Sequence, residues 1–213
     1  MSKPHITLYY APQTRATGTR IMLEELGAPY DLHLLDIHDE RYADAGFREV
    51  NPLCKVPTIK AGDTVITEQV AIAIYLGDYF ADAGLAPAID DPGRGTYLRW
   101  LVFYAACFEP ALMDKSTGHD PGPSSQSVYG SFDEMISTLE QALTPGPYLL
   151  GERMTVADIL WGVALHWTMM FGLVPENPIF REYVERITSR PAAVKITALD
   201  EMLVAELAEK REQ

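Results

Sequence analysis

The spacing of hydrophobic positions divides the chain into a mixed first part and a helical second part. Up to about residue 80, short runs that alternate apolar and polar side chains predict strands, and runs with apolar residues three or four apart predict helices. The expected order is strand 5–10, polar loop 13–19, helix 21–26, strand 30–37, irregular segment 39–51, strands 56–60 and 64–67, and helix 68–80. This βαβ–ββα order predicts one small mixed sheet with helices packed on it.

The second part shows only the period of helices. Residues 82–95 are rich in Ala, Gly, Pro and Asp without periodicity, which is typical of a linker. Thr155 and Asp158 have the spacing of a capping box, which predicts the start of a core helix. Helices are expected over 96–113, 125–143, 155–171, 179–189 and 193–210. The predicted fold class is therefore α/β plus all-α, with a first domain over 1–81 and an all-α domain over 96–213.

Composition and charge narrow the classes of function. The 213 residues carry 17 Lys and Arg against 30 Asp and Glu, a formal net charge of −13. This excess argues against nucleic-acid binding and against docking on an anionic membrane, because both need clustered basic residues. The longest apolar stretch, 159–174, is shorter than the roughly 20 residues that span a bilayer, so it predicts a core helix. We expect no nucleic acid and no membrane among the partners.

The cysteines and the start of the chain bear on the compartment. Cys54 and Cys107 lie far apart and form no CxxC pair, which excludes a disulfide framework or a zinc site of cysteine pairs. The opening residues, MSKPHITLYY, lack the apolar region of a secretory signal. Both observations predict a cytoplasmic protein.

Two local features could bind an extended ligand. Val56-Pro57 lies at the start of a predicted strand, where the proline either starts an edge strand or forms a cis bond that turns the Val56 backbone outward. Glu68-Gln69 lies at a predicted helix start, whose N–H groups can bind an anion while Glu68 binds an ammonium group. The alternative is that Glu68 only complements the dipole of its own helix.

Taken in order, the motifs NP-x-x-KVP-x-I, TEQVAIAIYL and GERMTVADI make the whole chain resemble the cytosolic glutathione transferase family. The resemblance implies a thioredoxin-like N-terminal domain that binds glutathione and a C-terminal helical bundle that receives an apolar second substrate. It also implies a homodimer that acts in detoxification, with glutathione as co-substrate and no metal.

The resemblance implies a role for each residue of the glutathione site. Val56, ahead of a cis Pro57, pairs its backbone with the cysteinyl part of glutathione. Glu68 holds the γ-glutamyl ammonium, and Gln69 stands where many members bind the γ-glutamyl carboxylate with Ser or Thr. Lys55 neutralises the glycyl carboxylate. Cys54 stands where glycine is common and is interpreted as a tolerated small side chain rather than a nucleophile.

The catalytic loop departs from the family pattern. Its length between Pro12 and Arg20 matches the bacterial beta class, but Arg15 replaces the cysteine of that class and Ala16 replaces its serine. The mixed-disulfide chemistry of the beta class is therefore in question. The candidates for stabilising the glutathione thiolate are Thr14, Arg15, Thr17 and Tyr9.

Among these candidates Thr14 and Arg15 are favoured. Arg15 has the alternative of a solvated loop residue, and Tyr9 has the alternative of core packing, because strand alternation turns either Tyr9 or Tyr10 inward.

The helix predicted over 96–113 offers a wall for the second substrate. Tyr104, Phe108 and Met113 recur at helical spacing and could line an apolar pocket, or could pack against other helices. Glu109 falls where the beta class has a glutathione-contacting histidine, so that contact does not carry over. His119 and His166 lack the spacing of a metal pair.

The leading functional hypothesis is a glutathione transferase that activates the glutathione thiolate for attack on a small apolar electrophile. A glutathione-dependent disulfide reductase or peroxidase is an alternative. The other alternative is a non-catalytic interaction module, which the missing cysteine and serine favour and the retained Lys55, Val56-Pro57 and Glu68 argue against.

Overall fold

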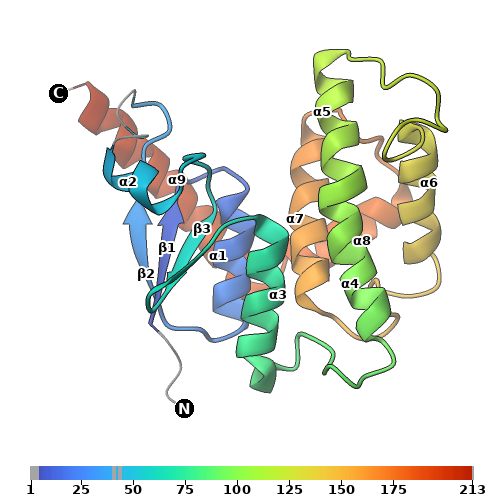
Figure 1. Cartoon of the computed structure of the whole chain (residues 1–213), viewed down its shortest axis with the longest axis horizontal. Coiled ribbons are helices and arrows are strands. Elements are labelled where there is room, and N and C mark those ends of the chain that lie inside the picture. The colour runs from blue at the N-terminus through green and yellow to red at the C-terminus, as the bar shows by residue number, and fades with distance from the viewer. Residues whose placement is uncertain (1–4, 40–41, 43–44, 213) are drawn as a thin grey trace. The chain divides into compact units, whose positions relative to one another are not determined.

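The computed structural model describes residues 5–39, 42 and 45–212, and the chain forms two compact units (Figure 1). Unit 1 contains Met1–Ala83 together with Arg190–Gln213, and unit 2 contains Gly84–Ser189. The predicted domains place the last helix with the helical domain, whereas its contacts place it in unit 1. A helical period identifies a helix but does not say which surface covers its apolar side.

Unit 1 is built on a four-stranded sheet with the order β2-β1-β3-β4. The strands are β1 (Ile6–Tyr10), β2 (Tyr30–Leu34), β3 (Thr58–Ala61) and β4 (Thr64–Ile66). β2 runs parallel to β1, while β3 is antiparallel to both β1 and β4. The β3–β4 turn uses Gly62 at a φ of 60°, a conformation that glycine adopts without steric cost. The predicted mixed sheet is confirmed.

The described residues of unit 1 also form the helices α1 (Ala16–Glu25), α2 (Ala45–Val50), α3 (Gln69–Tyr79) and α9 (Pro191–Arg211). A short 3₁₀ turn, Ala81–Ala83, follows α3. α1 begins five residues before the predicted helix 21–26. The side chain of Thr14 accepts a hydrogen bond from the N–H of Ala16, and this local cap starts the helix inside the segment expected to be a loop.

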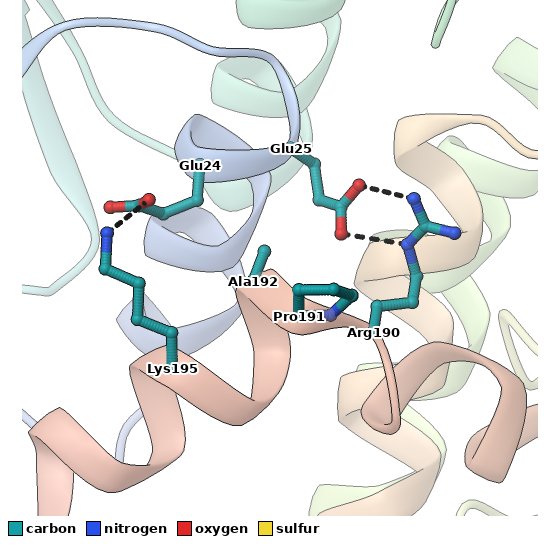
Figure 2. Close-up of a pocket in the computed structure, with 6 residues that line it drawn as sticks. All are labelled: Glu24, Glu25, Arg190, Pro191, Ala192 and Lys195. Atoms are coloured by element: carbon teal, nitrogen blue, oxygen red, sulfur yellow. Dashed lines mark hydrogen bonds and ion pairs between the residues drawn. The ribbon is translucent and has the colours of Figure 1, made fainter.

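α9 is attached to α1 by apolar packing and by ion pairs. Ala193 and Ile196 are buried on one face of α9. Arg190 donates two hydrogen bonds of 2.8 and 2.6 Å to Glu25, and Lys195 forms an ion pair of 2.8 Å with Glu24 (Figure 2). These four residues line a surface pocket of about 370 Å³. The buried apolar face, together with these ion pairs, places the last helix in unit 1.

Unit 2 is helical. Its helices are α4 (Arg94–Phe103), α5 (Glu109–Thr117), α6 (Phe132–Leu143), α7 (Val156–Met170) and α8 (Pro178–Thr188), and a π-helical turn, Tyr104–Phe108, joins α4 to α5. α6 starts later than predicted because Ser131 and Glu134 form a capping box there. Among the described residues, no helix is long and apolar enough to cross a bilayer.

The predicted capping box of α7 is present and buried. The N–H of Thr155 donates to Asp158 at 2.8 Å, and the Thr155 hydroxyl accepts from the N–H of Ala157 at 3.3 Å. Asp158 also accepts from the N–H of Leu149 and from the Tyr183 hydroxyl. Burial raises the pKa of Asp158, and these donors act against that shift. The box therefore connects the start of α7 to α8.

Candidate functional site

Three separate segments of unit 1 meet where β1 ends. Tyr9 pairs with Thr58, so the loop after β1 lies beside the segment that leads into β3. The side-chain amide of Gln69, the first residue of α3, donates to the carbonyl oxygen of Arg15 at 3.0 Å. The structure thus brings together the loop before α1, residues 55–57 and the start of α3.

The Val56–Pro57 peptide bond is cis, as the resemblance implied. The carbonyl oxygen of Lys55 accepts hydrogen bonds from the Asn51 side-chain amide at 3.0 Å and from the Thr58 hydroxyl at 2.8 Å. Asn51 and Thr58 are buried, whereas Lys55 is exposed and Val56 is half-buried. Two buried polar side chains therefore hold the backbone of Lys55, just before the cis peptide bond.

Asn51 and Thr58 have no role in the sequence-based predictions. Their signal is present in the motif, because an amide and a hydroxyl flank the segment that contains Lys55, Val56 and Pro57. Buried polar side chains need partners, and here the partner is the backbone.

The start of α3 lacks a side-chain cap. Glu68 precedes the helix with φ of 64° and ψ of 111°, a conformation that costs free energy for a residue with a Cβ. Its side chain is exposed and its carboxylate accepts from the Thr67 hydroxyl at 3.3 Å. The side chain of Glu68 therefore caps none of the first N–H groups of α3. Backbone conformations that cost free energy, such as that of Glu68, cluster at binding and active sites.

The two threonine candidates donate their hydroxyl protons within the protein. Thr14 donates to the carbonyl of Ala11 at 2.7 Å and caps α1 through its oxygen. Thr17 is buried and donates to the carboxylate of Asp200 at 2.7 Å. In this conformation, both hydroxyls hold the loop rather than face a ligand.

The other two candidates lie in contrasting places. Tyr9 is buried on the face of the sheet that α2 covers, where its ring stacks on Phe47 and tilts against His33. Arg15 is exposed and is the residue immediately before α1. Of the four candidates, Arg15 is the one whose side chain is exposed at the end of the loop.

Cys54 belongs to the same apolar cluster as Tyr9. It packs with Leu35 and Phe47 and is buried, with a φ of 50°. This environment agrees with a small structural side chain, because reactive cysteines lie in electropositive and accessible places.

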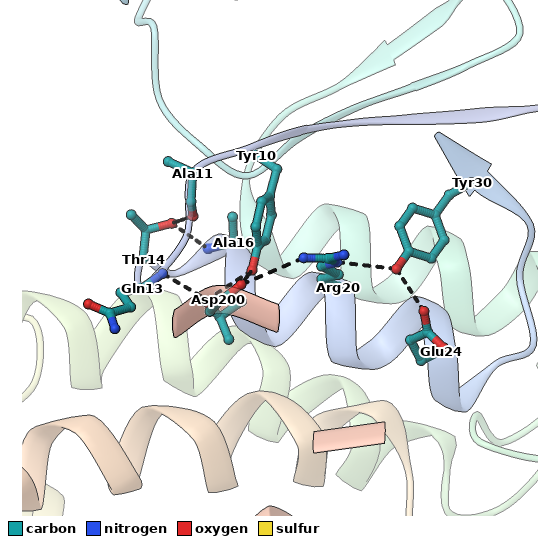
Figure 3. Close-up of polar contacts among 10 residues, drawn as sticks. Tyr10, Ala11, Gln13, Thr14, Ala16, Arg20, Glu24, Tyr30 and Asp200 are labelled. Carbon is teal, nitrogen blue, oxygen red and sulfur yellow. Dashed lines mark hydrogen bonds and ion pairs between the residues drawn. The ribbon is translucent and has the colours of Figure 1, made fainter. Parts of the chain in front are cut away.

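A buried polar network behind the loop was not anticipated. Asp200 of α9 accepts hydrogen bonds from the Tyr10 hydroxyl and from the N–H of Gln13 at 3.1 Å (Figure 3). It also accepts from the Thr17 hydroxyl. Arg20 lies 3.7 Å from the same carboxylate. Asp200 shares the helical face of the buried Ala193 and Ile196, so the signal was an acidic residue at an apolar position.

The residues predicted for the second substrate do not line one surface. Tyr104 and Phe108 are buried, and both rings pack on Trp161 at centroid distances of 5.4 and 4.8 Å. Met113 is 52% exposed. The Tyr104 hydroxyl donates to Glu109 across the π-helical turn. The spacing that suggested a pocket wall belongs, for the two aromatic residues, to the core of unit 2.

No group of three His, Cys, Asp or Glu side chains comes together as a metal site within the part of the chain that the structure describes. His166 lies on α7 beside Trp167, and desolvation lowers the pKa of its imidazole. His119 lines a surface pocket of unit 2 with a volume of about 430 Å³.

The chain matches known protein families in sequence. The profile "Glutathione S-transferase, N-terminal domain" matches residues 15–78, and "Glutathione S-transferase, C-terminal domain" matches residues 122–186. Similar sequences include glutathione S-transferase GstA of Escherichia coli O157:H7, 25% identical over 86% of this chain and 93% of that protein. Glutathione S-transferase theta-2 of Mus musculus is 29% identical over 78% of this chain and 74% of that protein.

Solved structures show the same fold. A glutathione transferase from Methylococcus capsulatus strain Bath has a TM-score of 0.79 at 28% identity, covering 92% of this chain and 99% of that one. A sphingomonad glutathione S-transferase complexed with glutathione has a TM-score of 0.74 at 25% identity, covering 92% and 98%. With both domain profiles matched in order over more than half of the sequence, and with the fold and the converging site above, this chain belongs to the glutathione S-transferase family.

Proposed function

We propose that this enzyme binds glutathione on unit 1 and transfers it to a small apolar electrophile. The observation that carries the site is the convergence of three segments, joined by the Tyr9–Thr58 pairing and the hydrogen bond from Gln69 to Arg15. A tripeptide needs contacts at its two ends and along its backbone, and the three segments offer one of each.

The γ-glutamyl end is proposed to lie at the start of α3. The first-turn N–H groups and the positive end of the helix dipole suit its carboxylate, and Gln69 can donate a further hydrogen bond. Glu68 is exposed and carries the negative charge that an ammonium group requires. The known cost of its backbone conformation supports a role in binding rather than in folding.

The cysteinyl and glycyl parts are proposed to lie along residues 55–57. The Val56 backbone, held by Asn51 and Thr58 through the Lys55 carbonyl, can pair with an extended peptide as an added strand does. Lys55 is exposed and can form an ion pair with the glycyl carboxylate.

Arg15, together with the positive end of α1, is proposed to stabilise the thiolate. Tyr9 is buried on the α2 face of the sheet, and Thr14 and Thr17 donate their protons inside the protein. A free thiol has a pKa near 8.5, and each unit of lowering requires about 1.4 kcal/mol of extra stabilisation of the anion. A guanidinium and a helix dipole each supply effects of that order.

The reaction then needs little else from the protein. The glutathione thiol loses its proton to solvent, and the thiolate sulfur donates an electron pair to the electrophilic carbon. A sulfur–carbon bond forms while the bond to the leaving group breaks, and the leaving group departs with that electron pair.

Calorimetry with glutathione tests the proposal directly. We expect saturable binding, and turnover of a chlorinated aromatic acceptor that releases chloride. Arg15→Ala should lower kcat/KM at neutral pH about tenfold, which corresponds to one pKa unit of the thiol. Arg181→Ala, which removes an exposed arginine of unit 2, is the matched control. It should change neither the glutathione affinity nor kcat/KM. A protein that binds no glutathione would refute the proposal, and turnover of a small mixed disulfide alone would identify a reductase.

Two finer parts of the proposal rest on the family. The enzyme is proposed to be a homodimer, for which light scattering should give twice the mass of the chain. It is also proposed to act in the cytoplasm, which the unpaired Cys54 and Cys107 support, because a reducing compartment keeps thiols free.

A further inference from the structure

Asp200 is a buried carboxylate whose hydrogen-bond donors come from the segment that forms the proposed thiolate site. Its side chain is 3% exposed. One oxygen accepts from the Thr17 hydroxyl at 2.7 Å and from the Gln13 N–H at 3.1 Å, and the other accepts from the Tyr10 hydroxyl (Figure 3). One group from α9 therefore holds the end of β1, the loop and the first turn of α1.

The hydrogen bond to Gln13 acts on the backbone of the loop itself. Gln13 has a φ of 54°, a left-handed conformation that is uncommon for a residue with a side chain. Such a conformation persists only where surrounding contacts hold it, and the Asp200 carboxylate supplies one directly at the N–H of this residue. Thr14 and Arg15 follow immediately, so the conformation of Gln13 determines where α1 begins.

The Tyr10 hydroxyl remains a hydrogen-bond donor to Asp200 over the ordinary pH range. Burial and the Asp200 carboxylate raise the pKa of the Tyr10 phenol far above its ordinary value, so the phenol stays protonated and donates. Arg20 lies 3.7 Å from Asp200, and its Nε donates to the Tyr30 hydroxyl at 3.3 Å. The carboxylate is therefore satisfied on both oxygens.

We propose that Asp200 is a positioning residue for the glutathione thiolate: it holds the loop from Ala11 to Arg15 so that Arg15 and the start of α1 face the sulfur. This inference rests on the proposed function. Asp200 itself touches no part of the substrate, and it acts through Gln13, Thr17 and the helix that follows them.

The direction in which the pKa of the glutathione thiol changes distinguishes a positioning role of Asp200 from a purely electrostatic one. Asp200 is negative, so removing its charge should by electrostatics alone favour the thiolate and lower the pKa of the glutathione thiol. Loss of positioning has the opposite effect, because the donors at the start of α1 no longer face the sulfur and the pKa rises. The two explanations therefore predict shifts in opposite directions.

The experiment measures the ultraviolet absorption of the thiolate of bound glutathione against pH, with binding by calorimetry. Asp200→Asn should raise the thiol pKa by about one unit and lower kcat/KM at neutral pH about tenfold, with glutathione affinity within about threefold of the parent. Thr17→Val keeps the charge but removes one donor, and it should shift the pKa in the same direction by less.

Glu25→Gln is the matched control, because it also breaks an α1–α9 contact, with Arg190, at the far end of α1 (Figure 2). It should lower thermal stability and leave the thiol pKa unchanged.

Three results would overturn the inference. The first is an unchanged or lowered thiol pKa in folded Asp200→Asn. The second, which decides the matter if Asp200→Asn does not fold, is an unchanged pKa in Thr17→Val. The third is a raised pKa in Glu25→Gln, which would show that any loosening of α9 acts on the site. Absence of glutathione binding by the parent protein would refute the proposed function, and this inference with it.

Discussion

The side-chain amide of Gln69 donates to the backbone carbonyl of Arg15 at 3.0 Å, which joins the first residue of α3 to the residue immediately before α1. The two residues are 54 positions apart in the sequence. This hydrogen bond closes the proposed glutathione site on one side, and it uses a side chain that also lies at the proposed γ-glutamyl position.

Gln69→Ala should therefore weaken glutathione binding more than it slows the chemical step. It removes one hydrogen bond and the link to Arg15, which together are worth about 1 kcal/mol. We expect the KM for glutathione to rise about fivefold while kcat stays within about twofold. Gln141→Ala, which removes an exposed glutamine of α6, should leave both constants unchanged. A large fall in kcat with unchanged KM would contradict the assignment.

Lys55→Ala should reduce glutathione affinity about tenfold, because an exposed ion pair with hydrogen bonding to a carboxylate contributes on the order of 1 kcal/mol. Lys60 is an exposed lysine of β3, so Lys60→Ala makes the same change in net charge outside the site. Its affinity should match the parent. Equal losses in the two variants would show that net charge, rather than position, matters.

The dependence of glutathione affinity on ionic strength tests where the positive potential of the protein lies. The chain has a formal net charge of −13, and glutathione is itself an anion. Salt weakens the local attraction of Lys55 and also the general repulsion, so the affinity should change little between low and moderate ionic strength. A steep loss of affinity with salt, measured by calorimetry, would show that a basic surface governs binding.

Gly162→Ala should destabilise unit 2. A Cβ built at Gly162 of α7 would lie 2.6 Å from Cβ and Cγ1 of Ile187 on α8, closer than such atoms can approach. Overpacking costs about 1–3 kcal/mol, which exceeds the roughly 1 kcal/mol that alanine gains over glycine within a helix. Gly95→Ala on α4 meets nothing within 4 Å and should be neutral or slightly stabilising in a denaturation curve. A Gly162→Ala variant as stable as the parent would refute close packing of α7 on α8.

Glu24→Gln should change the acid side of the stability curve. Burial of Glu24 acts to raise its pKa, but hydrogen bonds from Lys195 and Tyr30 outweigh burial and lower it below 4.5. A lowered carboxyl pKa stabilises the folded state above the unfolded pKa, and this stabilisation is lost as the pH falls through the folded pKa. The variant should therefore be less stable at pH 7 and lose less stability below pH 4.5, as judged by thermal midpoints. Parallel curves for the two proteins would contradict this.

The sequence predicts the local parts of the fold well and the distant ones poorly. β1 and β3 lie within about two residues of the predicted strands, because alternation and turn residues such as Gly62 act over a few positions. The start of α1 was missed, since a threonine cap looks like polar loop until its hydroxyl is seen to accept from Ala16. The contacts of α9 with α1 cannot be read from the sequence, because Glu24 and Glu25 precede their partners on α9 by more than 160 residues.

The same limit applies to the candidate site. Lys55, Val56 and Glu68 were identifiable because each belongs to a compact motif. The state of Thr17 was not, because its hydroxyl is taken up by Asp200, 183 positions away. Tyr104 and Phe108 show the converse error: helical spacing describes a face of the helix, and only the packing on Trp161 shows that this face is in the core.

The return of α9 to unit 1 makes the helical unit an insertion within the sheet-containing unit. During synthesis, the strands and α1 emerge first, yet the Asp200 carboxylate that satisfies Tyr10, Gln13 and Thr17 is made only after all of unit 2. The part of the protein that is translated first is therefore completed last, because a nascent chain that ends before Arg190 still lacks the carboxylate on which Tyr10, Gln13 and Thr17 converge.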